Sequence, residues 1–257
     1  MNKFLRSWSL EHLTPATEPL LLARFDSAAK CAAWRVSVDA EFGGRSSAVF
    51  EFNERRQCGV FRGSLDLSTA GTRMKQSGFA AITMPRFAHA LDLTPFDRLR
   101  FRLRARGSVF ISNIKTDSRI DDDLFQCFML PGTAHARAQR PKATAYSRIV
   151  SPFAADVQPA HKPTPSAAAA AAERSSAAAA GSDDQRPFEV LDLLFRDYAL
   201  TWRGFVEDED VQLDPFDVVS LGILMAERRN GTFELDLHSI EAVTAEQVEA
   251  ETKRFQC

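Results

Sequence analysis

The sequence predicts an all-β protein, a sandwich or barrel built from about eight or nine short strands. Three observations support this prediction: short apolar runs recur between turn signals, one segment alternates strictly between apolar and polar residues, and little of the chain has helical periodicity. A chain of 257 residues is long enough for one large domain. We therefore expect a single β-domain at residues 20–243, preceded by a tail at 1–19 and followed by a helical tail at 244–257.

The first clear strand follows a turn at Gly43-Gly44, because glycine adopts a positive φ at little cost. In residues 47–52 the apolar side chains of Ala48, Phe50 and Phe52 fall on one side of an extended chain. No lysine-bearing phosphate loop surrounds the two glycines, so they are interpreted as a structural turn. Similar runs predict strands at residues 58–67, 78–84, 98–106, 109–114, 124–130, 188–195, 218–225 and 232–243.

Local signals place the connections between these strands. Asp26-Ser27 predicts a cap for a helix at residues 28–34, and residues 244–247 have the form of a capping box that opens a C-terminal helix. Asn230-Gly231 predicts a hairpin turn. Residues 196–210 are expected to be a loop, and Gly63 is expected to mark a bulge or close backbone packing.

The strongest alternation in the chain lies at residues 98–106. Leu99, Phe101 and Leu103 interleave with arginines, which predicts a half-buried strand with one apolar face and one arginine face. That arginine face has two interpretations: a basic stripe for an acidic partner or RNA, or an outer sheet face whose arginines pair with carboxylates on neighbouring strands. The net charge of -2 and the absence of stacking aromatics on this face favour the second.

Composition and motifs exclude several function classes. The near-neutral charge argues against nucleic acid or an anionic membrane as the main partner, and no apolar run approaches the length of a transmembrane helix. The four cysteines lack zinc or disulfide-framework spacing, which favours free thiols in a reducing compartment. Residues 121–123 are adjacent aspartates without the spacing of a calcium loop. We find no nucleophile elbow or dinucleotide fingerprint, so no catalytic, cofactor-binding or metal-binding residue is predicted, and the protein is expected not to be an enzyme.

Two segments stand apart from the β-domain. Residues 1–10 carry Lys3 and Arg6 among apolar residues, which fits either a short organelle-targeting segment or a tail with a hydrophobic tether. Residues 159–187 are dominated by alanine, proline and serine, and are interpreted as a disordered low-complexity insertion. Strand-like sequence resumes beyond it in the same style, so the insertion interrupts one domain.

Six short blocks follow one another along the chain: Gly43-Gly44-Arg45-Ser46, Phe61-Arg62-Gly63-Ser64-Leu65, Ser77-Gly78-Phe79-Ala80, Asn113-Ile114-Lys115, Ser220-Leu221-Gly222-Ile223 and Gly231-Thr232-Phe233-Glu234-Leu235. Taken in this order, they resemble the complex I intermediate-associated proteins, which are assembly factors for mitochondrial NADH:ubiquinone oxidoreductase. The resemblance departs from the family pattern at residues 193–195, where Leu-Leu-Phe replaces Ile-Pro-Phe, at Arg106-Gly107, where the family has Gly-Asp-Gly, and in the long insertion.

The resemblance implies a galactose-binding-like jelly-roll sandwich and a non-catalytic chaperone role. Its implied partners are complex I subunits, in an intermediate of the membrane arm, and other assembly factors. Its implied location is the mitochondrial matrix, free or peripheral to the inner membrane. A carbohydrate-binding module is the alternative for such a fold, although the aromatic residues here are widely spread.

The candidate partner-binding residues come from two segments. Exposed Trp and Arg are enriched at interfaces, although Trp202 is equally well explained as a core residue at the end of the sandwich. The arginine face supplies the second candidate surface. The six candidates are Trp202, Arg203, Phe205, Arg100, Arg102 and Arg104.

Overall fold

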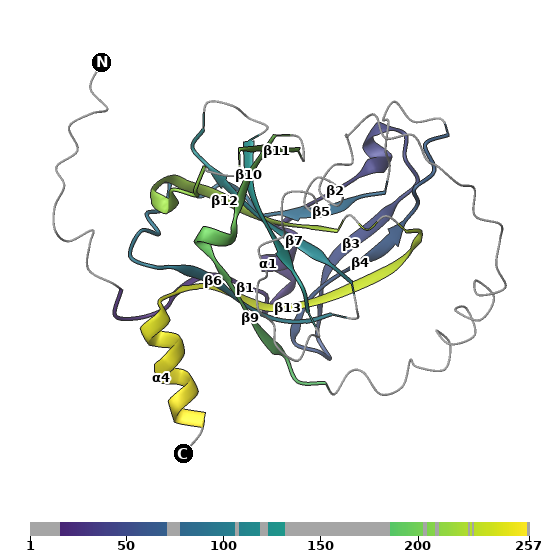
Figure 1. The fold of residues 1–257 in the computed structure, drawn as a ribbon. Helices are drawn as coiled ribbons and strands as arrows, with labels where there is room; N and C mark the ends of the chain where they lie inside the picture. The colour runs from purple at the N-terminus through teal and green to yellow at the C-terminus, as the bar shows by residue number, and fades with distance from the viewer. Residues whose placement is uncertain are drawn as a thin grey trace.

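Two antiparallel sheets pack face to face in the computed structural model of the chain (Figure 1). The structure describes residues 16–70, 78–105, 108–118, 123–131, 186–202, 205–208, 211–225, 227 and 229–255. Within these residues one sheet has six strands and the other seven. Strands distant in sequence lie side by side, so the predicted all-β jelly-roll sandwich is confirmed. The predicted tail at 1–19 and the predicted insertion at 159–187 fall almost wholly outside the described residues.

The first sheet, sheet A, is organised around the long strand β13. Its strands are hydrogen-bonded in the order β3 (Ser47–Asn53), β4 (Cys58–Leu65), β13 (Gly231–Val243), β6 (Arg98–Ala105) and β9 (Glu189–Leu194), and β1 (Leu20–Arg24) also pairs with β13. The register of β13 shifts between Leu237 and Ser239 where it pairs with β6, which marks a bulge at His238.

The second sheet, sheet B, contains the remaining strands. In hydrogen-bonded order they are β11 (Phe205–Asp208), β10 (Ala199–Trp202), β8 (Asp123–Met129), β7 (Phe110–Thr116), β12 (Val218–Met225), β5 (Ala80–Thr83) and β2 (Arg35–Val38).

Two short helices have the caps that the sequence predicts. Helix α1 (Ala28–Ala32) begins after Ser27, whose side chain accepts a hydrogen bond from the Lys30 backbone N–H. Helix α4 (Ala245–Phe255) begins with a reciprocal capping box, because Thr244 N–H donates to Gln247 Oε1 at 2.9 Å and Gln247 N–H donates to Thr244 Oγ1 at 3.3 Å. No helix among the described residues is long and apolar enough to cross a membrane.

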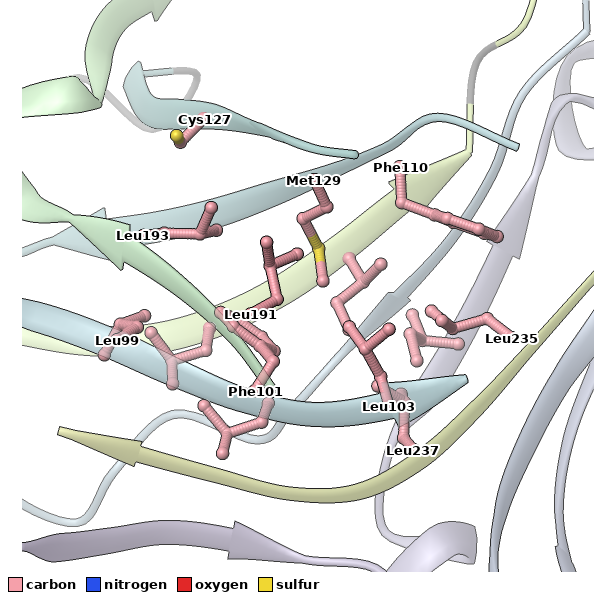
Figure 2. Close-up of a cluster of buried hydrophobic side chains, with 14 of the residues drawn as sticks. Leu99, Phe101, Leu103, Phe110, Cys127, Met129, Leu191, Leu193, Leu235 and Leu237 are labelled. Atoms are coloured by element: carbon pink, nitrogen blue, oxygen red, sulfur yellow. The ribbon is translucent and has the colours of Figure 1, made fainter. Parts of the chain in front are cut away.

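The core lies between the inner faces of the sheets. In β6, Leu99, Phe101 and Leu103 are all buried, as the alternation predicts. Figure 2 shows these three side chains in one cluster with Met129 of β8, Leu191 and Leu193 of β9, Phe110 of β7 and Leu235 of β13. Each buried aliphatic or aromatic side chain of this kind contributes roughly 1.5–3 kcal/mol, so this layer is the main source of stability.

Two of the described cysteines, Cys31 and Cys127, belong to this core, whereas Cys58 is buried beside Arg104 and Asp236. All three are free thiols, and the structure buries each of them, which the sequence had left open. Burial raises the pKa of Cys31 to about 11 and that of Cys58 to about 12, so both remain protonated thiols at neutral pH.

A buried carboxylate holds the Gly43-Gly44 turn. Asp39 is fully buried, and its side chain accepts hydrogen bonds from Ser46 N–H and Ser46 Oγ, both at 2.9 Å, and from Gly78 N–H. Gly43 has a φ of 88°, and a Cβ on Gly44 would lie 2.4 Å from the Asp39 carboxyl carbon. Both glycines are therefore structural, and Asp39 joins the turn to the start of β5.

Two predicted connections are wrong. Residues 196–210 are not a loop, because β10 pairs with β8 and β11 to form a hairpin. β10 has only four residues, too few to display a period, and its pairing with β8 stabilises it. The Asn230-Gly231 turn does not join paired strands, because β12 lies in sheet B and β13 in sheet A. Turn residues favour a chain reversal, whereas the available strand partners decide the sheet.

Close packing at Gly63 yields a test of sheet A. A Cβ at Gly63 would lie 2.1 Å from the Ser47 carbonyl oxygen, whereas a Cβ at Gly231 meets nothing within 4 Å. We expect Gly63→Ala to lower the free energy of unfolding in urea by about 1–3 kcal/mol. The control Gly231→Ala, two residue pairs away in the same β4–β13 ladder, is expected to change it by less than about 0.5 kcal/mol. Equal effects of the two substitutions would contradict this packing.

Candidate partner-binding surfaces

The arginines of β6 lie on the outer face of sheet A. Because β6 alternates, Arg98, Arg100, Arg102 and Arg104 point away from the core that Leu99, Phe101 and Leu103 enter. The acidic groups that these arginines meet come from β9, β13 and α4, and from Asp97 just before the strand. The structure therefore pairs the arginine face with neighbouring carboxylates, the second of the two interpretations of this segment.

Arg100 is the most enclosed of these arginines. Its side chain is 7% exposed, and its Nε and Nη2 donate to the two carboxylate oxygens of Asp192 at 2.8 and 2.9 Å. Its Nη1 donates to Glu251 of α4. The hydrogen bond with Asp192 raises the pKa of Arg100, against the effect of burial, so the guanidinium stays charged. A two-point fork of this kind fixes the position of both partners.

Arg104 forms a second enclosed cluster. Its Nε and Nη2 donate to Asp236 Oδ2 at 3.1 and 2.7 Å, and its guanidinium carbon lies 4.4 Å from the centre of the Phe188 ring. Arg56 donates to the other oxygen of Asp236 at 3.1 Å. Burial nevertheless raises the pKa of Asp236, although Arg56 and Arg104 both lower it. Ion pairs thus join three charged groups from the β3–β4 connection, β13 and β6.

Arg102 is more accessible than its neighbours. Its side chain is 43% exposed, and its ion pair is a 3.3 Å contact with Glu251. Among the predicted arginines that the structure describes, it is the one with guanidinium surface available to another molecule. Sequence reasoning could not rank the three arginines, because their exposure depends on which acids lie opposite.

Trp202 lies at the end of β10, away from the arginines. It is 38% exposed and is paired in register with Asp123 of β8 and Phe205 of β11. The backbone of Arg203 and the side chain of Phe205 lie outside the described residues. Since β10 belongs to sheet B and β6 to sheet A, the structure does not bring the two predicted surfaces together.

Sequence reasoning missed the acids and the aromatic residues that complete the arginine face. Asp192 and Asp236 occupy alternate positions in predicted strands, a pattern that could have indicated outward carboxylates. Phe188 and His238 have ring centres 5.4 Å apart beside Arg104. Burial lowers the pKa of His238, with Arg24 and Arg102 acting in the same direction. No local signal indicates this stack, because it joins segments that meet only in the folded sheet.

Fold and surface together define the class of protein: a two-sheet antiparallel β-sandwich with a network of ion pairs on one outer face. The chain belongs to the family described as Complex I intermediate-associated protein 30 (CIA30), whose model matches residues 23–158, more than half of the 257 residues. A comparison with curated proteins finds no match.

Solved structures similar to this chain are carbohydrate-binding modules and agarases. A family 11 carbohydrate-binding module from Clostridium thermocellum, in complex with a β-1,3-1,4-mixed-linked tetrasaccharide, is 11% identical with a TM-score of 0.48, over 90% of this chain and 98% of that chain. The same family 11 module of the cellulase Lic26A-Cel5E from that organism gives a TM-score of 0.48 at 11% identity, over 90% and 96%. An agarase is 8% identical with a TM-score of 0.41, over 87% of this chain and 26% of its own.

The two-point ion pair between Arg100 and Asp192 can be tested by measuring the free energy of unfolding of variants. Removing one member of a buried pair leaves the other charge uncompensated, so we expect Arg100→Met to lower the free energy of unfolding by about 3 kcal/mol. Arg62 and Glu51 are paired on the same sheet but are 53% and 54% exposed, so Arg62→Met should cost less than about 1 kcal/mol. The double variant Arg100→Met/Asp192→Leu should recover much of the loss, and no recovery would argue against a paired charge.

His238 predicts a pH dependence of stability. Its Nδ1 is buried without a hydrogen-bond partner, and the fold lowers its pKa. The unfolded chain therefore binds the proton more readily, so the contribution of His238 to stability is present above about pH 6.5 and is lost as the pH falls through the lowered value. We expect urea unfolding from pH 7.5 to 5 to show a steeper loss in the wild type than in His238→Phe. Identical slopes would contradict the assignment.

Proposed function

We propose that the protein is a non-catalytic assembly factor of mitochondrial complex I that holds an intermediate of the membrane arm. The observation that carries this proposal is membership of the complex I intermediate-associated family, whose model matches residues 23–158, from the end of β1 to beyond β8. Its partners would be complex I subunits and other assembly factors. It would act in the mitochondrial matrix, free or attached peripherally to the inner membrane.

The geometry supports a binding role for the outer face of sheet A. The charged groups of Arg56, Arg100, Arg104, Asp192 and Asp236 are engaged with one another in ion pairs, which holds the surface rigid. A preorganised surface loses little conformational entropy when a partner docks. The same pairing occupies these groups, which supports a non-catalytic role.

Two accessible points on this scaffold are proposed contacts. Arg102 is the exposed arginine of the β6 face, and Trp202 is a half-exposed aromatic residue at the β10–β11 hairpin. Arg203 and Phe205 are proposed to extend the second contact, and Arg100 and Arg104 to support the first. Because the two contacts lie on different sheets, a partner that uses both would have to wrap around the sandwich, or each would serve a different subunit.

Affinity purification from mitochondria tests this proposal. We expect the tagged wild-type protein to migrate on native gels with complex I subunits, in a subcomplex smaller than the mature enzyme. Arg102→Glu is expected to reduce recovery of these subunits at least fivefold. The matched control is Arg62→Glu, which places the same charge change at an exposed arginine of the same sheet.

The design separates loss of binding from loss of folding. Each variant must retain the wild-type unfolding midpoint in urea, because Arg102 makes one long ion pair and is not part of the core. Recovery of the wild-type protein outside mitochondria, or without complex I subunits, would overturn the assembly role. Normal recovery with Arg102→Glu would leave the assembly role standing and remove Arg102 from the contact surface.

A further inference from the structure

One carboxylate spans two arginines at the junction between α4 and sheet A. Glu251 Oε2 accepts a hydrogen bond from Arg100 Nη1, and Glu251 Oε1 lies 3.3 Å from Arg102 Nη2. Arg100 and Arg102 are two residues apart in β6, so their side chains leave the same face of the strand. The two guanidinium groups therefore form a receptor for a single carboxylate, and the chain fills it with its own residue.

The enclosed arginine requires an acceptor in this place. Asp192 already accepts hydrogen bonds from Nε and Nη2 of Arg100, which leaves Nη1 for Glu251. The Arg100 side chain is 7% exposed, so an Nη1 group without a partner would be poorly solvated. Glu241 lies opposite Arg100 on β13, but its Oε1 instead accepts from Ser239 Oγ at 3.2 Å.

Helix α4 is held to the sandwich along a narrow stripe. Of residues 245–253, Gln247, Val248 and Glu251 are half-buried and the others are exposed. Figure 1 shows α4 extending away from the sandwich near β1, β6 and β9. Besides Glu251, Gln247 also contacts the body, because its Nε2 donates to the Ala16 carbonyl oxygen at 2.9 Å. A helix attached in this way can leave without disturbing the core.

We propose that Arg100 and Arg102 are a docking site for an acidic helix of a protein partner, and that α4 occupies this site until such a helix displaces it. The partner would present a glutamate where α4 presents Glu251. The site would then be exposed only when the partner is present, which protects the sandwich from binding unrelated acidic segments. This inference rests on the proposed function for the source of the partner, but the contact itself can be tested with purified protein.

The surrounding charges favour a single carboxylate over a polyanion. Asp192 on β9 and Glu241 on β13 lie on either side of Arg100, so a polyphosphate bound there would meet like charges on both neighbouring strands. A helical side chain that delivers one carboxylate avoids them, as α4 does. The chemistry thus selects a protein segment in preference to nucleic acid.

Intramolecular competition has a measurable consequence. A tethered helix is present at an effective concentration on the order of millimolar. In most molecules α4 therefore occupies the two arginines. The apparent affinity for an external helix is reduced in proportion to the fraction of molecules in which the arginines are unoccupied. Repelling α4 from the arginines should raise that affinity.

The test uses the full chain and a synthetic peptide with the sequence of residues 244–255, labelled with fluorescein and followed by fluorescence anisotropy. Glu251→Arg places a positive charge against Arg100 and Arg102, so α4 should leave the site. We expect the peptide to bind this variant at least tenfold more tightly than it binds the wild type. A peptide with Gln in place of the glutamate of position 251 should bind this variant at least tenfold more weakly. Adding Arg102→Glu to the protein variant should abolish binding of the original peptide.

Several outcomes would overturn the proposal. Equal peptide affinity for the wild type and Glu251→Arg would mean that α4 does not compete with the peptide. Equal affinity of the Glu and Gln peptides for Glu251→Arg would mean that the peptide binds at another place on the protein. A wild-type dimer that Glu251→Arg dissociates would assign the site to a second copy of the chain. If Glu251→Arg does not fold, Glu251→Gln replaces it, with the same order of affinities expected. Failure here would leave co-purification with complex I subunits unaffected, so the two proposals fail separately.

Discussion

Strand β13 is the constraint on which the rest of the structure depends. Its 13 residues pair with β4 along the first half, with β1 near the end, and with β6 from Leu235 onward. Its inner face places Leu235 and Leu237 in the core, and its outer face places Asp236 between Arg56 and Arg104. Without this strand sheet A would separate into a β3–β4 hairpin and a β6–β9 pair, and the charged face would lose its centre.

The bulge in β13 links the packing of the sheet to its outer surface. The register shifts between Leu237 and Ser239, and the carbonyl oxygen of His238 accepts a hydrogen bond from Phe25 N–H at 3.0 Å. On the outer face the ring of His238 lies beside Phe188, which lies under the guanidinium of Arg104. The ion pairs, the aromatic stack and the bulge are therefore one continuous assembly, and a partner that touches one part meets a surface positioned by the others.

Sequence and structure agree where the signal is local and repeated. The alternation at residues 98–105 predicted both the strand and its faces, and the capping residues Ser27 and Thr244 predicted where helices begin. Agreement ends where a short segment depends on its neighbours: four residues at 199–202 carry too little pattern to indicate a strand until β8 lies beside them. The same limit applies to the candidate site, since the six predicted residues were chosen by type, and their exposure depends on distant partners.

The sequence by itself determined the all-β class, the inward and outward sides of β6, the structural role of Gly43 and the family. Periodicity and turn chemistry act over a few neighbouring residues, so they can be recognised in the sequence alone. Only the tertiary structure decided that the Asn230-Gly231 turn connects different sheets, that Asp39 fastens the Gly43-Gly44 turn, and that Glu251 lies across Arg100 and Arg102. Each of these depends on which segments meet in space, and Glu251 is separated from Arg100 and Arg102 by 151 and 149 positions in the sequence, so no local pattern indicates the contact.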